Sequence, residues 1–105
     1  MKKPVLYSRL KFFIKPHPEL HPAGEKVFVP RDNLVIRFWF EGNLQVEGDE
    51  NNLQINLNDD QLLVLALSGK GVNRIFRIPW QRLVSIELVQ KDSLDKEFFQ
   101  KIFLN

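Results

Sequence analysis

Short segments that alternate apolar and polar residues, with turn residues about every ten positions, constrain this chain more than any other feature. The alternation is clearest at residues 34–41, 53–58 and 83–89, and turn signals such as Gly42-Asn43 separate the segments. A period of two indicates strands, because successive side chains of a strand point to opposite faces. The continuous apolar run at 62–67 is typical of a strand covered on both sides. We therefore expect a mainly β fold of about six or seven strands, as a small antiparallel barrel or a strongly bent sheet.

The two ends of the chain have a different pattern. Apolar residues at helical spacing predict one amphipathic C-terminal helix over about 93–104, packed across the sheet. This stripe consists of Leu94, Phe98, Phe99, Ile102 and Phe103. Residues 5–14 fit either a strand or a short helix, and both alternatives stay open. The proline-rich segment 15–22 predicts an extended loop.

Size and composition indicate one globular domain over residues 1–105. There is no cysteine, which excludes disulfides and thiolate metal sites and fits the cytoplasm, where we expect the protein. No apolar run approaches the roughly 20 residues that span a bilayer. The formal net charge is +2 and the basic residues are scattered, which argues against nucleic acid as the partner.

No group of residues in the sequence carries recognisable catalytic chemistry. His17 and His21 lie among prolines and lack a further ligand, so we expect no metal site and no cofactor. Asp59-Asp60 fits a turn, and Gly69-Lys70-Gly71 lacks the long phosphate-binding loop. These observations favour a protein that is not an enzyme.

One candidate binding surface runs along the predicted strands at 62–67 and 74–78. Small side chains would let another backbone approach closely, Arg74 could bind a carboxylate, and Phe76 could supply apolar area. In the alternative interpretation, the two glycines only make a hairpin turn. The candidate residues are Ala66, Ser68, Gly69, Gly71, Arg74 and Phe76.

A second candidate surface lies on the predicted strand at 34–41. Arg37 and Trp39 share the face opposite to Ile36 and Phe38, and an exposed aromatic beside a cation is typical of interfaces. The alternative is that the C-terminal helix covers this face. In the later strand, the alternation places Val84 on the same face as Ile86 and Leu88.

Several short motifs from Val27 to Leu88 are similar to stringent starvation protein B, a family of peptide-binding adaptors for an AAA+ protease. They are Val27-Phe28-Val29-Pro30, Asn52-Leu53-Gln54-Ile55 with Asp59-Asp60, the stretch from Leu62 to Gly71, and Arg74-Ile75-Phe76-Arg77-Ile78-Pro79. Lys70 separates the paired glycines here, and Ser68 stands where the family has an aromatic residue. The resemblance implies an open β-barrel that binds an extended peptide in a groove.

The segment from Gly71 to Leu88 also resembles bacterial pleckstrin-homology-like domains, which combine about seven strands with one C-terminal helix. That resemblance implies a scaffold for interaction or assembly. Both families are non-catalytic, so we expect a module that binds a protein or an extended peptide and acts as a proteolysis adaptor or as an assembly scaffold. A small virus-encoded inhibitor of a host protein and a homodimer are also compatible with the sequence.

Overall fold

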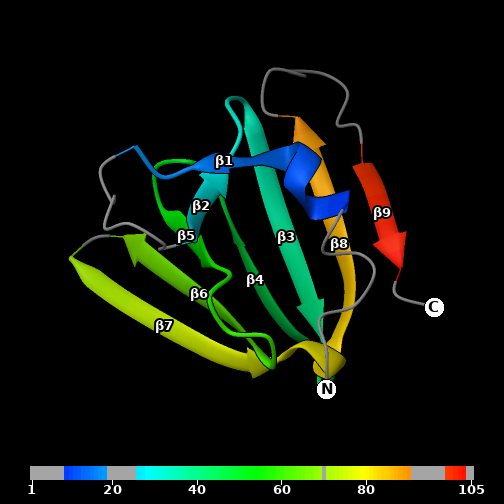
Figure 1. The fold of residues 1–105 in the computed structure, drawn as a ribbon. Helices are drawn as coiled ribbons and strands as arrows, with labels where there is room; N and C mark the ends of the chain where they lie inside the picture. Colours follow the sequence, from blue (N-terminus) through cyan, green and yellow to red (C-terminus); the bar gives the residue numbers. More distant parts are fainter. Residues whose placement is uncertain (1–8, 19–25, 70, 91–98, 104–105) are drawn as a thin grey trace.

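The computed structural model describes residues 9–18, 26–69, 71–90 and 99–103, and it shows two antiparallel β-sheets (Figure 1). The first sheet has the strand order β1-β2-β5-β6-β7, and the second has the order β4-β3-β8-β9. The mainly β prediction is therefore confirmed. The predicted barrel is wrong in one respect, because the strands form two sheets that do not close into one ring.

The strands are short, as the spacing of turn signals predicts. The first sheet contains β1 (Ile14–Pro16), β2 (Val27–Pro30), β5 (Leu53–Asn56), β6 (Leu62–Gly69) and β7 (Val72–Pro79). The second sheet contains β4 (Leu44–Gly48), β3 (Leu34–Phe40), β8 (Leu83–Gln90) and β9 (Phe99–Phe103). Two short 3-10 turns complete the described part, η1 (Lys11–Phe13) and η2 (Trp80–Arg82). None of the described residues forms a helix with the length and apolar character needed to cross a bilayer.

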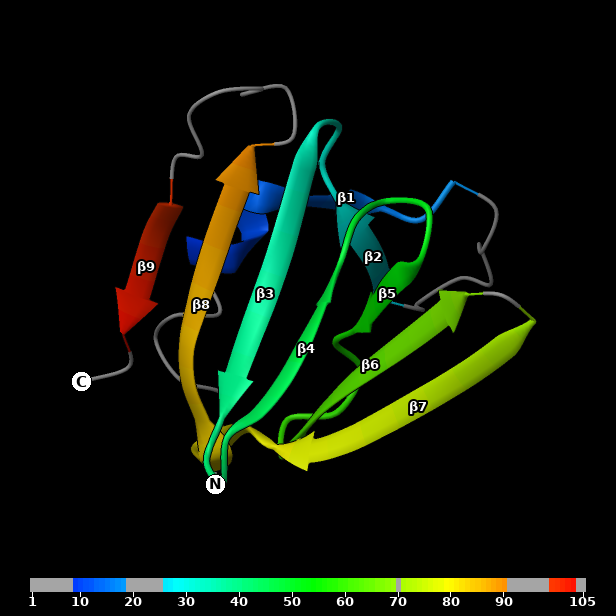
Figure 2. The ribbon, with the colours of Figure 1, turned by 180° about the vertical axis from the view of Figure 1, so that it is seen from behind.

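The chain passes between the sheets at three places, after β2, after β4 and after β7 (Figure 2). The passage after β4 requires a glycine. A Cβ atom on Gly48 would lie 2.6 Å from both the Asn52 side chain and the Leu53 Cβ atom, which is closer than atoms can approach. This close approach lets the chain bend sharply from one sheet into the other.

The core lies between the inner faces of the sheets. The second sheet contributes Ile36, Phe38 and Phe40, which share one face as the alternation predicts. The Phe38 and Phe40 rings stack with their centroids 6.4 Å apart. Trp80 in η2 closes one end of the core with 1% of its surface exposed, and its indole Nε1 donates to the Asp59 carbonyl at 3.4 Å. The first sheet contributes Val29, Leu53, Ile55, Leu63 and Leu65.

The predicted C-terminal helix over 93–104 is wrong where the structure describes that segment. Residues 99–103 form β9, which pairs with β8 from Ser85↔Phe103 to Val89↔Phe99. Residues 91–98 lie outside the described part. The apolar residues of this stretch, Phe99, Ile102 and Phe103, have helical spacing and do not alternate with polar ones, so the local pattern does not predict the strand. Pairing with β8 is a tertiary interaction, which overrides a local helical pattern.

For residues 5–14, where the sequence fits either a strand or a short helix, the structure shows part of each. Residues 9–13 form one helical turn that ends in η1, and Ile14 begins β1. Residues 5–8 lie outside the described part. Leu10 in this turn is 1% exposed and belongs to the core, so the short helical stripe at 10–13 packs onto the sandwich.

Candidate functional site

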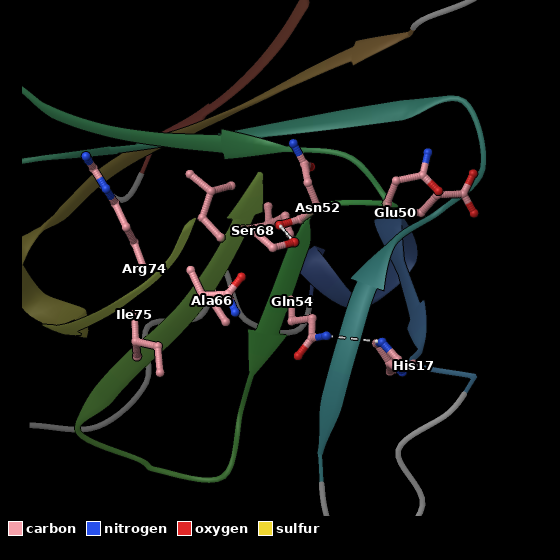
Figure 3. Close-up of a pocket in the computed structure, with 12 residues that line it drawn as sticks. His17, Glu50, Asn52, Gln54, Ala66, Ser68, Arg74 and Ile75 are labelled. Atoms are coloured by element: carbon pink, nitrogen blue, oxygen red, sulfur yellow. Dashed lines mark hydrogen bonds between the residues drawn. The ribbon is translucent and has the colours of Figure 1, made fainter. Parts of the chain in front are cut away.

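A surface hollow of about 260 Å³ lies on the first sheet, where β5, β6 and β7 meet the β4–β5 turn (Figure 3). Most of the residues that line it are of polar types, and they come from five parts of the chain. His17 follows β1, Glu50 and Asn52 belong to the turn, and the remaining lining residues come from the three strands. Those from the strands include Gln54, Ala66, Ser68, Arg74 and Ile75.

Strand register places three of these residues in one row on the outer face of the sheet. Gln54 lies opposite Ala66, and Ala66 lies opposite Ile75, so all three side chains share a face. Ala66 leaves space between its larger neighbours. Gln54 Nε2 lies 3.2 Å from His17 Nε2, which ties this row to the residue after β1. The row therefore has a shallow centre with larger side chains on both sides.

The predicted surface along 66–76 is divided between the two faces of the sheet. Ala66 and Ser68 lie on the outer face, whereas Arg74 pairs with Leu67 and Phe76 pairs with Leu65 on the opposite face. Figure 3 shows Arg74 and Ile75 projecting to opposite sides of β7. Both Ala66 and Arg74 still line the hollow, because Arg74 sits near the end of the sheet.

The other three predicted residues do not line the hollow. Phe76 is half-buried and packs against the core. Gly69 is the last residue of β6, and Gly71 lies in the hairpin turn with a φ of 76°. A positive φ favours glycine at that position, as the turn interpretation predicts. Whether any of the six residues binds a ligand stays a prediction.

Strand β7 forms one edge of the first sheet, a feature that the sequence pattern did not reveal. No strand of the described part pairs with its outer side, and Val72 and Ile75 are each 56% exposed. Arg74 and Arg77 are exposed, and neither makes an ion pair with a carboxylate of the described residues. The lack of clean alternation at 72–77 and the terminal Pro79 were the available signals, since both are typical of edge strands.

The alternative surface at Arg37 and Trp39 is engaged within the second sheet. Arg37 Nε donates to Glu47 at 3.1 Å and Arg37 Nη1 donates to Glu87 at 3.3 Å. Trp39 Nε1 donates to the other Glu87 oxygen, and Gln45 donates to Glu47. Both predicted residues are only half-buried, but their polar atoms are already occupied by neighbouring strands.

A cluster of three charged side chains borders the hollow and joins three separate segments of the chain. Lys15 in β1 binds Asp32, in the turn before β3, and Glu50 at 2.9 Å in the β4–β5 turn. Hydrogen bonds to Asp32 and then to Glu50 raise the pKa of Lys15 above its ordinary value. The hydrogen bond from Lys15 lowers the pKa of Asp32. Lys15 thereby holds Glu50 at the margin of the hollow.

The chemistry available at the hollow is recognition by hydrogen bonds and charge. No three His, Cys, Asp or Glu side chains of the described residues are grouped as metal ligands would be. His17 lies at the hollow, and His21 lies outside the described part. Ser68 Oγ lies 3.5 Å from the Asn52 carbonyl oxygen, so its nearest partner in the structure is backbone.

Comparisons with protein-family models, with curated proteins and with solved structures find no match to this chain. The resemblances to stringent starvation protein B and to pleckstrin-homology-like domains therefore stay predictions.

Proposed function

We propose that this protein is a non-catalytic module that binds an extended segment of a partner protein by adding it as a strand to β7. The observation that carries the proposal is the long edge of β7 beside the hollow. In an edge strand, every second residue directs its backbone N–H and C=O groups away from the sheet. An extended peptide can pair with these groups, while neighbouring pockets select its side chains.

The lengths of the edge strands support β7 over the alternatives. Strand β7 has eight residues, whereas β1 has three and β4 and β9 have five each. Natural proteins usually keep edge strands short or cover them, since an open edge invites association. A long edge that no described strand covers, and that exposes Val72 and Ile75, is a suitable template for a partner.

The hollow supplies the second part of the recognition. Its outer-face row runs from Gln54 across Ala66 to Ile75 on β7, so a strand added beyond Ile75 continues the same row. Side chains of the added strand that point to the outer face would lie next to Ile75 and could reach the space above Ala66. The hollow and the edge therefore form one continuous surface.

A display selection from random peptides of about ten residues tests the proposal, because that length covers the whole of β7. The affinity of an enriched peptide is then compared with that of a version N-methylated at alternate residues. We expect N-methylation to weaken binding at least tenfold, since it removes the hydrogen-bond donors that pair with the edge. Equal affinity of the two peptides would show that no strand is added.

A matched pair of variants locates the site. Ala66→Gln puts a larger side chain at a position that lines the hollow, whereas Val84→Gln places the same side chain at an exposed position of the other sheet. We expect Ala66→Gln to weaken peptide binding about tenfold and Val84→Gln to leave it unchanged. Circular dichroism of both variants checks that the fold is retained. If both variants bind as the original protein does, the hollow is not part of the site.

A further inference from the structure

We propose that the segment accepted by β7 is acidic, with two carboxylates three residues apart that meet Arg74 and Arg77; this inference rests on the proposed function above. Both arginines are exposed, and neither has a carboxylate partner in the described part of the chain. In contrast, Lys15 and Arg37 each bind two carboxylates. Both cations described on β7 are thus available to a strand that pairs with this edge.

The hairpin that carries these arginines is basic as well. The whole hairpin from residue 62 to residue 79 contains no Asp or Glu, and it carries Lys70, Arg74 and Arg77. A cation without an opposing charge nearby attracts an acidic partner and repels a basic one. Arginine also presents several N–H donors in a planar array that matches the two oxygens of a carboxylate.

The spacing of the partner's carboxylates follows from the register of β7. Arg74 lies opposite Leu67 and Arg77 lies opposite Val64, so the two arginines point to opposite faces of the sheet. Their partners on an added strand must also point to opposite faces. Carboxylates three residues apart meet this condition, whereas carboxylates two or four residues apart share one face.

The side chain between them is also constrained. Ile75 is 56% exposed on the outer face, next to Arg74 in the sequence. The residue of the added strand that faces Ile75 should be apolar, because cross-strand apolar pairs stabilise a sheet. The expected pattern is therefore an acid, an apolar residue, any residue and a second acid, written in the order that faces Arg74 to Arg77.

The same arginines argue against a second copy of this chain as the occupant. The β7 strand of a second copy carries the same two arginines and no carboxylate, so a pair of β7 strands would gather four arginines with no opposing charge from either strand. Like charges brought together across an interface are unfavourable. Single-stranded nucleic acid is also disfavoured, because it needs exposed aromatic rings for stacking, and Phe76 packs against the core.

The display selection from random peptides provides the first test. We expect the enriched sequences to carry two carboxylates three residues apart with an apolar residue next to one of them. The best peptide is then compared with a rearranged peptide of the same composition whose carboxylates are two residues apart. We expect the rearranged peptide to bind at least tenfold more weakly. The difference in affinity between the two peptides should become smaller at high salt, because salt screens the charges.

A charge exchange gives the decisive control. We expect the double variant Arg74→Glu with Arg77→Glu to lose at least tenfold in affinity for the acidic peptide and to bind the matching Lys peptide instead. Arg82→Glu changes an exposed arginine in η2, outside β7, and should leave binding unchanged. Circular dichroism establishes that the variants fold. If charge reversal disrupts the strand, the double variant Arg74→Gln with Arg77→Gln replaces it in the test of affinity for the acidic peptide.

The outcomes separate this inference from the proposed function. If peptides bind but both spacings bind equally, or the charge exchange changes nothing, the acidic pattern is overturned while strand addition stands. If selection yields no binder of any charge, both are overturned. Tighter binding of an oligothymidine that depends on the same arginines would overturn the inference in favour of nucleic acid. A concentration-dependent dimer that Ile75→Asp abolishes would overturn it in favour of self-association.

Discussion

Glu87 shows at the scale of one residue how a charge is retained inside a mostly apolar strand. Its surface is 5% exposed, although it lies on the outer face of β8. Trp39 Nε1 and Arg37 Nη1 donate to its two oxygens, and Arg37 also binds Glu47. Burying a carboxylate without such donors would be strongly unfavourable. Glu87 therefore organises the outer face that the sequence indicated as an alternative binding surface.

Two matched substitutions test the importance of burial. We expect Glu87→Ala to lower the free energy of unfolding by about 1.5–3 kcal/mol, because it removes hydrogen bonds to a charged group and leaves Trp39 Nε1 without its acceptor. Glu47 has 41% of its side chain exposed, so Glu47→Ala should cost less than about 1 kcal/mol. Equilibrium unfolding in urea measures both. Equal losses would show that burial does not distinguish the two carboxylates.

At the scale of one element, β8 departs from simple alternation. Trp39 pairs with Ser85 but Phe40 pairs with Leu83, so Val84 is an extra residue in a β-bulge. The alternation predicted Val84 on the same face as Ile86 and Leu88, which is the core face in the structure. In the structure Val84 is 45% exposed, and Leu83 takes the core position with 3% exposed. The bulge changes which side chain enters the core.

Substitutions at the bulge test this placement. We expect Val84→Lys to change the free energy of unfolding by less than about 0.5 kcal/mol, because the side chain is at the surface. Leu83→Ala should cost about 2–5 kcal/mol, because it leaves a cavity in the core. Thermal or urea unfolding of the two variants provides the measurement. The reverse order of the two losses would mean that β8 has no bulge here.

At the scale of the whole molecule, the two sheets depend on one shared core. The chain passes between them three times, and residues from both sheets form a single buried cluster. Neither sheet has a second apolar layer of its own among the described residues. We therefore expect the sheets to unfold together as one cooperative unit.

Trp80 provides a probe for this cooperativity, since it lies at the passage from β7 to β8 and is 1% exposed. The chain has two tryptophans, so Trp39→Phe leaves Trp80 as the only indole. In that variant we expect the fluorescence transition in urea to coincide with the far-ultraviolet circular dichroism transition. Separate midpoints would indicate that one sheet unfolds before the other.

The sequence by itself determined where most strands lie and which of their faces are apolar. The expected strands at 34–41, 62–67 and 83–89 correspond to β3, β6 and β8 within a few residues. The burial of Ile36, Phe38 and Phe40 follows the predicted face. These properties depend on local alternation, and a strand's side chains alternate whatever its partners are.

Only the tertiary structure decided which strands become neighbours and which remain at an edge. The apolar residues at 99–103 have helical spacing, yet pairing with β8 makes this segment a strand. The same holds for the candidate site, where register separated Arg74 and Phe76 from Ala66 and left Arg77 and Ile75 on an open edge. Pairing and register arise from contacts between residues distant in the sequence, so a local pattern does not predict them.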